Sequence, residues 1–121
     1  NMATSINLDA STRVDITCRR GDTFTLELTF TDNAGAAIDL SSGYTWKMDV
    51  KETDTSSGDI IGDADFSYTG TAGGKLTITA SATTMSGVPG GLYVYDLQSN
   101  SVGVVKTWVY GLFKVNEDVS E

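Results

Sequence analysis

The acidic residues between positions 54 and 65 are the first candidates for chemistry in this sequence. The segment DTSSGDIIGDAD contains four aspartates, Asp54, Asp59, Asp63 and Asp65. Calcium takes about 6–8 oxygen ligands, which carboxylates and loop carbonyls supply. The spacing differs from that of an EF-hand loop, where acids alternate and a glutamate closes the loop. We therefore expect a solvated acidic loop, and keep these four aspartates as weak candidates for a metal site.

A second candidate is the tripeptide Arg20-Gly21-Asp22, which is an adhesion signal in some extracellular proteins. Adhesion requires the tripeptide at the tip of an exposed loop. Here it runs straight into the alternating segment TFTLELTF, residues 23–30. Glycine allows backbone angles that other residues resist, and aspartate accepts hydrogen bonds from nearby backbone amides. We predict that Arg20, Gly21 and Asp22 form a structural turn into a strand.

The sequence lacks the usual residues of catalysis. It contains no histidine and one cysteine, Cys18. This excludes Ser-His-Asp and Cys-His catalysis and all histidine-containing zinc sites. Without a nearby base, we expect Cys18 to be a small buried residue at a strand end. Glu27 and Asp49 fall on polar faces of predicted strands, so we expect no paired-carboxylate site. The prediction is a protein that is not an enzyme and needs no cofactor.

The aromatic residues have several possible uses. Trp46 is in phase with Tyr44, Met48 and Val50, so we assign it to the interior. On the strand 92–98, Tyr93 and Tyr95 share one face and apolar residues also occupy the other, which predicts either a central strand or a strand partly covered by a neighbouring subunit. Tyrosine and tryptophan are enriched in interface cores. The possible interface residues are therefore Tyr93, Tyr95, Trp108 and Tyr110.

The elements that position these residues are strands. Alternation of apolar and polar residues, with turn residues between the segments, predicts strands over 14–18, 24–30, 44–51, 64–69, 75–80, 92–98 and 104–115. Gly111 suggests a bulge or bend in the last strand. Ser81 is expected to cap one helical turn over residues 82–85, which Gly87 ends. Short strands with one buried face describe an antiparallel β-sandwich.

The length of 121 residues suits a single domain. We divide it into a flexible N-terminal arm (1–13), a sandwich domain (14–116) and a C-terminal tail (117–121). The formal net charge is −8, from 16 acids and 8 bases, and the longest basic run is Arg19-Arg20. Such a surface repels phosphate backbones and anionic lipids, so we expect neither nucleic acid nor membrane as a partner.

The order of these motifs resembles a known family. A basic residue and Gly-Asp at positions 20–22 precede the alternating strand 24–30; a D-x-x-G turn (32–35), the segment IDL (38–40) and a second alternating strand (44–51) follow. The segment PGGLYVYDLQSNSVGVVKTWVYGLFKV, 89–115, adds a G-x-Y-x-Y strand and a closing hairpin. Across residues 14–115 the sequence resembles the immunoglobulin-like N-terminal domain of phage baseplate upper proteins.

The resemblance implies an immunoglobulin-like sandwich of about seven to eight strands in a bacteriophage virion. It implies a structural role through contacts with other virion proteins and with copies of the chain, after assembly in the host bacterial cytoplasm. Larger members of the family continue into helices and receptor-binding parts, which this sequence does not contain. A place in the baseplate, tail or neck, or as a capsid decoration, therefore stays open. The alternative is a carbohydrate- or receptor-binding module for host attachment, which predicts an exposed aromatic cluster.

Overall fold

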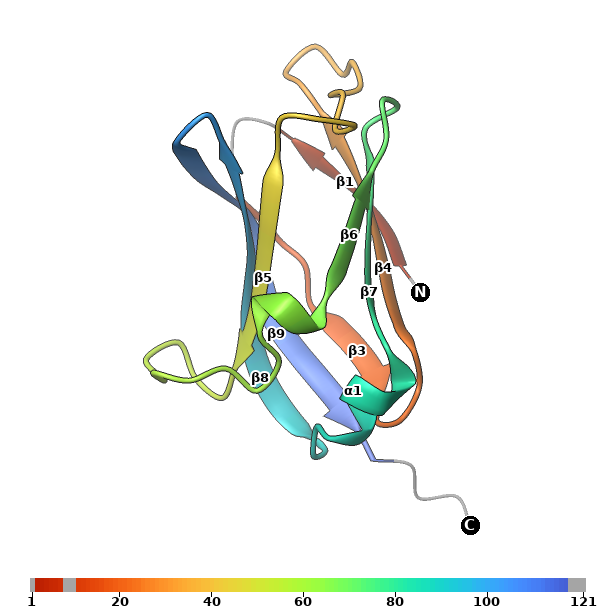
Figure 1. Ribbon diagram of the computed structural model, residues 1–121, viewed down its shortest axis with the longest axis vertical. Helices are drawn as coiled ribbons and strands as arrows, with labels where there is room; N and C mark the ends of the chain where they lie inside the picture. Colours follow the sequence, from red (N-terminus) through yellow and green to blue (C-terminus); the bar gives the residue numbers. More distant parts are fainter. Residues whose placement is uncertain (1, 8–10, 118–121) are drawn as a thin grey trace.

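The computed structural model describes residues 2–7 and 11–117, with side chains described from residue 11 onward. The strands form two sheets that face each other (Figure 1). Sheet A has the order β1 (Met2–Asn7), β4 (Phe24–Thr31), β7 (Lys75–Ala80) and β6 (Ser67–Gly70). Sheet B has the order β2 (Thr12–Arg13), β9 (Val104–Asn116), β8 (Gly91–Ser101) and β5 (Thr45–Lys51), and β3 (Ile16–Arg19) also pairs with β9. The all-β sandwich is confirmed.

The core lies between the two sheets, as the alternation predicted. Along β4, every second side chain from Phe24 to Phe30 is buried, and along β5 Trp46, Met48 and Val50 are buried. Aromatic rings join the sheets: the ring centroids of Phe30 and Trp108 are 4.9 Å apart in a T-shaped pair. Strands with one apolar face pack in this way because successive side chains point to opposite faces.

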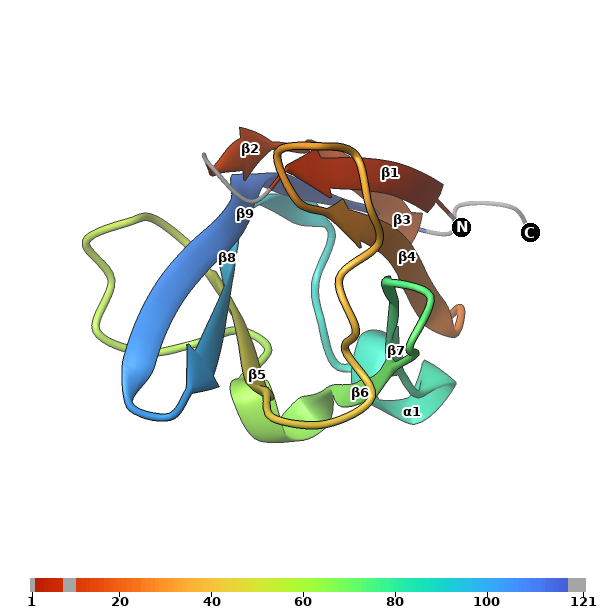
Figure 2. The same cartoon turned by 90° about the horizontal axis from the view of Figure 1, so that it is seen from above.

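Three pairings differ from the antiparallel arrangement that we expected. β1 pairs with β4 in parallel, and β2 and β3 both pair with β9 in parallel. The segment 1–13, assigned from the sequence to a flexible arm, thus contributes a strand to each sheet. Figure 2 shows β1 and β2 along the same side of the sandwich. Parallel edge pairs leave no hairpin signal in the sequence, because hairpin turns join only antiparallel strands.

The last strand changes its buried face, but not at the glycine. The register between β8 and β9 shifts at Leu97/Gln98, and the consecutive residues Trp108 and Val109 are both buried. The bulge therefore precedes Gly111. Gly111 serves a close approach instead: a Cβ atom there would lie 2.5 Å from the carbonyl oxygen of Val14. Only glycine leaves room for the link between β2 and β3 to run this close beside β9.

The short helical turn is confirmed as α1 (Ala82–Ser86). The Ser81 hydroxyl accepts a hydrogen bond from the Thr84 amide, and Gly87 is the C-cap. A 3-10 turn, η1 (Asp63–Asp65), precedes β6. None of the described helices is long and apolar enough to cross a membrane.

Candidate functional site

The Arg20-Gly21-Asp22 segment is the turn between β3 and β4. Gly21 has φ +89°, in the left-handed region that favours glycine, and the Asp22 amide donates to the Arg19 carbonyl at 3.3 Å. No hydrogen bond to the Asp22 carboxylate is found within the described residues, so the predicted aspartate cap of this turn is not formed there.

The Arg20 side chain is turned toward its own chain rather than presented to a receptor. Its Nε donates to the Ser86 carbonyl at 2.9 Å, and its guanidinium lies 3.1 Å from the Glu117 carboxylate. Glu117 also accepts a hydrogen bond from the Gly90 amide at 2.7 Å. These hydrogen bonds lower the pKa of Glu117, the Gly90 amide contributing most. The tripeptide therefore ties the β3–β4 turn to α1 and to the end of β9.

The four candidate metal ligands are distributed around the acidic loop. Asp65, the last residue of η1, caps this turn because its carboxylate accepts a hydrogen bond from the Gly62 amide at 3.0 Å. The Asp63 amide donates a hydrogen bond to the Asp49 carboxylate at 3.2 Å. Asp54 and Asp59 lie in the loop between β5 and η1. Within residues 2–7 and 11–117, no group of three or more acids, histidines and cysteines is arranged to hold a metal ion.

Three of the four possible interface aromatics belong to the core instead. Tyr93, Tyr95 and Trp108 are buried between the sheets, so they are not available to a partner. The Tyr95 hydroxyl donates to the Val14 carbonyl, and Trp108 Nε1 donates to the Ser99 hydroxyl at 2.7 Å. Tyr110, which points to the outer face of sheet B, is 43% exposed. The sequence could not separate these cases, because both faces of β8 carry apolar residues.

Burial of both tryptophans bears on the alternative of a carbohydrate- or receptor-binding module. Trp46 and Trp108 are 8% and 2% exposed. Trp46 stacks against Tyr44, with ring centroids 5.6 Å apart, within its own strand region. An aromatic platform for sugars needs exposed ring faces, and the two largest rings of this chain do not offer them.

Cys18 is half-buried at the end of β3, and its thiol donates weakly to the Lys114 carbonyl at 3.6 Å. Burial, with a smaller contribution from the Asp22 charge, raises the pKa of the thiol to about 11. The reactive thiolate is therefore scarce at neutral pH.

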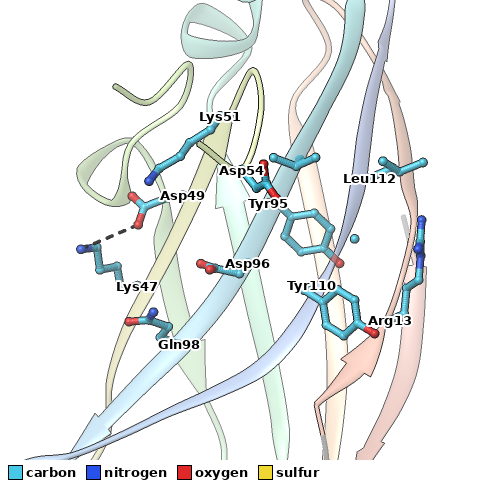
Figure 3. Close-up of a pocket in the computed structure, with 12 residues that line it drawn as sticks. Arg13, Lys47, Asp49, Lys51, Asp54, Tyr95, Asp96, Gln98, Tyr110 and Leu112 are labelled. Atoms are coloured by element: carbon cyan, nitrogen blue, oxygen red, sulfur yellow. Dashed lines mark ion pairs between the residues drawn. The ribbon is translucent and has the colours of Figure 1, made fainter. Parts of the chain in front are cut away.

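A hollow on the outer face of sheet B is a feature that sequence reasoning missed. It has a volume of about 450 Å³ and is shown in Figure 3. Its lining combines charged, aromatic and aliphatic side chains from β2, β5, the acidic loop, β8 and β9. We call it the sheet B hollow; its side chains include Arg13, Lys47, Asp49, Lys51, Asp54, Val94, Asp96, Gln98, Tyr110 and Leu112. Outward positions of three adjacent strands meet here, and that meeting depends on the register.

Two carboxylates face each other on the floor of this hollow. Asp49 of β5 and Asp96 of β8 are direct register partners, and Lys47 lies 3.8 Å from Asp49 (Figure 3). Burial raises the pKa of Asp96, while Lys51 and Lys47 act against that shift. Burial also raises the pKa of Asp49, and the nearby Asp59 charge adds to it. Like charges opposite each other are destabilising in a sheet, so the lysines have a compensating role.

Comparison with known proteins supports the fold assignment. No family model matches the chain, and no curated protein sequence is significantly similar to it. Among solved structures, the chain is similar to the N-terminal domain of phage TP901-1 ORF48, with 11% identity and a TM-score of 0.56, over 95% of this chain and 99% of that one. The NK cell receptor Nkp44 overlaps at 13% identity and a TM-score of 0.42, over 89% and 100% of the two chains. The first likeness extends over nearly the whole of both chains, so the two share one sandwich fold.

Proposed function

We propose that this protein is a non-enzymatic structural component of a bacteriophage virion. The observation that carries the proposal is the shared fold with a phage protein domain, over 95% of this chain and 99% of that one. The motif order across residues 14–115 supports the same assignment independently of the coordinates, because it resembles phage baseplate upper proteins. The protein would act through contacts with other virion proteins and with copies of itself.

The outer face of sheet B is the surface best suited to such contacts. Leu92, Val104, Val105 and Tyr110 are exposed on β8 and β9, each at least 43% accessible. By the register, Val104 and Val105 lie at the turn of the β8–β9 hairpin, Tyr110 lies opposite Asp96 near its middle, and Leu92 lies opposite Lys114 near its other end. The exposed apolar side chains are therefore spread along the hairpin and offer separate contact points to a partner. Among the described residues, β2 pairs with Val109–Tyr110 and β3 pairs with Phe113–Asn116, and the Ser11 hydroxyl donates to the Thr107 carbonyl. Within that part of the chain, residues 104–106 at the start of β9 are left for β-augmentation.

The chemistry of the described residues supports a structural role over a catalytic one. The sheet B hollow holds carboxylates, lysines and an exposed tyrosine, but the chain has no histidine to act as a general base near neutral pH. The thiol with a raised pKa, Cys18, lies on β3 and is not among the residues lining the hollow. Assembly in the host bacterial cytoplasm agrees with a lone, unpaired cysteine.

Immunogold labelling of purified phage particles, viewed by electron microscopy, tests both whether the protein belongs to the virion and where in the particle it lies. Antibody raised against the purified chain should label intact particles at one fixed place: baseplate, tail, neck or capsid. A particle preparation from a phage that lacks the gene is the control and should carry no label. Label found only on free protein or on host cell envelopes would overturn the proposal.

A further inference from the structure

The turn between β8 and β9 forms an apolar tip that the fold itself does not require. The two-residue loop places Val102 at φ +52° and Gly103 at φ +81°. Such hairpin turns favour Asn-Gly or Asp-Gly, because β-branched residues rarely adopt the left-handed region. Val102 is nevertheless 97% exposed, and the next residues, Val104 and Val105, are both exposed. We call residues 101–105 the hairpin tip.

The tip stands at an end of sheet B that carries little negative charge. Residues 41–46 and 99–108, which form this end, contain one lysine and no acid, in a chain with 16 acids. Lys106 is the nearest charge along the hairpin, and its ammonium lies 4.9 Å from the centroid of the Trp108 ring. The tip therefore combines an apolar surface with a local positive charge.

The opposite end of sheet B has the complementary character. The loop after β5, residues 52–65, contains five acids and no base. Figure 1 shows this loop and the hairpin tip at opposite ends of the sheet. The loop supplies Asp54 to the sheet B hollow, whose lining also contains the aliphatic side chains of Val94 and Leu112. The hollow itself is lined by three bases and three acids, so the excess negative charge next to it comes from the acidic loop. An apolar tip with a positive flank matches a partly apolar hollow beside that loop.

We propose that the hairpin tip of one copy docks in the sheet B hollow of a second copy, with Val102 against Val94 and Leu112 and Lys106 near the acidic loop. The contact is head-to-tail, because tip and hollow are different surfaces of the same chain. Such heterologous contacts build rings or filaments rather than closed two-fold dimers. Pairing tip to tip would bring two Lys106 side chains together, whereas docking in the hollow places Lys106 toward the five acids of the loop 52–65.

This inference deepens the proposed function by naming one contact between copies, and rests on it only for its biological setting. Two valines, one leucine and one screened charge attraction form a small contact, so we expect weak association that many copies in a particle reinforce. The association should weaken as salt is raised, because the complementary charges are exposed.

Sedimentation velocity on two complementary variants tests the proposal with the purified chain. Val102→Asp removes the tip and leaves the hollow, while Val94→Arg fills the hollow and leaves the tip. Each variant alone should stay monomeric up to about 1 mM, at least tenfold above the concentration at which the wild type associates. An equimolar mixture should form a one-to-one dimer and nothing larger, because each dimer has one working contact.

Two further variants serve as controls. Thr69→Asp adds the same charge on an exposed position of β6 in the other sheet, and should associate like the wild type. Val102→Asn suits the turn better, so it should melt at a higher temperature than the wild type while still losing association. A wild type that stays monomeric at about 1 mM, variants that associate normally, or a mixture that stays monomeric would each overturn the proposal. Immunogold labelling of particles does not depend on this contact, so the two proposals fail separately.

Discussion

The Arg20 guanidinium lies 3.1 Å from the Glu117 carboxylate, although 97 residues separate them in the chain. The same side chain donates to the Ser86 carbonyl at 2.9 Å. An arginine that reads as part of an adhesion signal in the sequence thus joins the β3–β4 turn, α1 and the end of β9. Its contacts are intramolecular, and they explain the residue without a receptor.

Replacing Arg20 by alanine should lower the free energy of unfolding modestly. The hydrogen bond to Ser86 contributes on the order of 0.5–1.5 kcal/mol net, whereas the ion pair is exposed and adds little. Urea denaturation measures the change. The matched control is Arg13→Ala, which removes only an exposed ion pair to Asp15 and should have a smaller effect. Equal losses in the two variants would contradict the linking role of Arg20.

Gly21→Val should destabilise the fold by about 1–2 kcal/mol, because a non-glycine residue is strained at φ +89°. The added Cβ would meet only Ser86 Oγ at 3.8 Å, an ordinary contact, so the cost is in the backbone. Gly21→Asn should cost less, since asparagine tolerates this region. Thermal melting of both variants measures the difference; wild-type stability in Gly21→Val would refute the interpretation as a structural turn.

Ser99→Ala should leave the buried Trp108 Nε1 without a partner. The pair is 2.7 Å apart, and Ser99 is 3% exposed. An unsatisfied buried donor costs about 1–3 kcal/mol. Chemical denaturation followed by tryptophan fluorescence measures both the stability and the environment of Trp108. Ser101→Ala, at the hairpin tip, is the control and should change the stability little. An unchanged midpoint in Ser99→Ala would show that water or another group replaces the hydroxyl.

The pH dependence of stability should distinguish two aspartates of opposite character. Burial raises the pKa of Asp96, so the charge of this carboxylate opposes folding at pH 7. The loss of stability disappears as the pH falls through the folded pKa to below the pKa of the unfolded chain, near 3.8. Asp96→Asn should therefore be more stable than the wild type at pH 7, with no difference near pH 3.

Asp39 is the matched control with the reverse sign. Hydrogen bonds from the Ser41 hydroxyl and amide lower the pKa of Asp39, so its charge stabilises the fold above the unfolded value near 3.8. Asp39→Asn should be less stable than the wild type at pH 7, and the difference should vanish as pH falls through the folded pKa. Unfolding curves across this pH range check both variants; shifts of the same sign would contradict the assigned environments.

The sequence predicts those parts of the fold that depend on neighbours along the chain. The alternation from Phe24 to Phe30 identifies the buried face of β4, and Ser81 identifies the start of α1. The residues 1–13 show the limit: their strands pair in parallel with distant strands, and no turn residue records such a pairing.

The candidate site was less predictable, because it depends on register. Tyr93 and Tyr95 were possible interface residues since both faces of β8 are apolar, and only the position of sheet A shows which face is inward. The meeting of Asp49 with Asp96 follows from the register of β5 on β8. The bulge at Trp108, rather than at Gly111, decides which residues after it point outward.

Quantitative mass spectrometry of phage particles tests whether the protein is a structural component of the virion. Particles would be purified on a density gradient and washed with salt, and the protein would be measured relative to the major capsid protein. We expect a constant ratio that survives the wash and corresponds to several copies in each particle. A ratio that falls toward zero with each wash, with the protein left in the host cell lysate, would contradict a structural role in the virion.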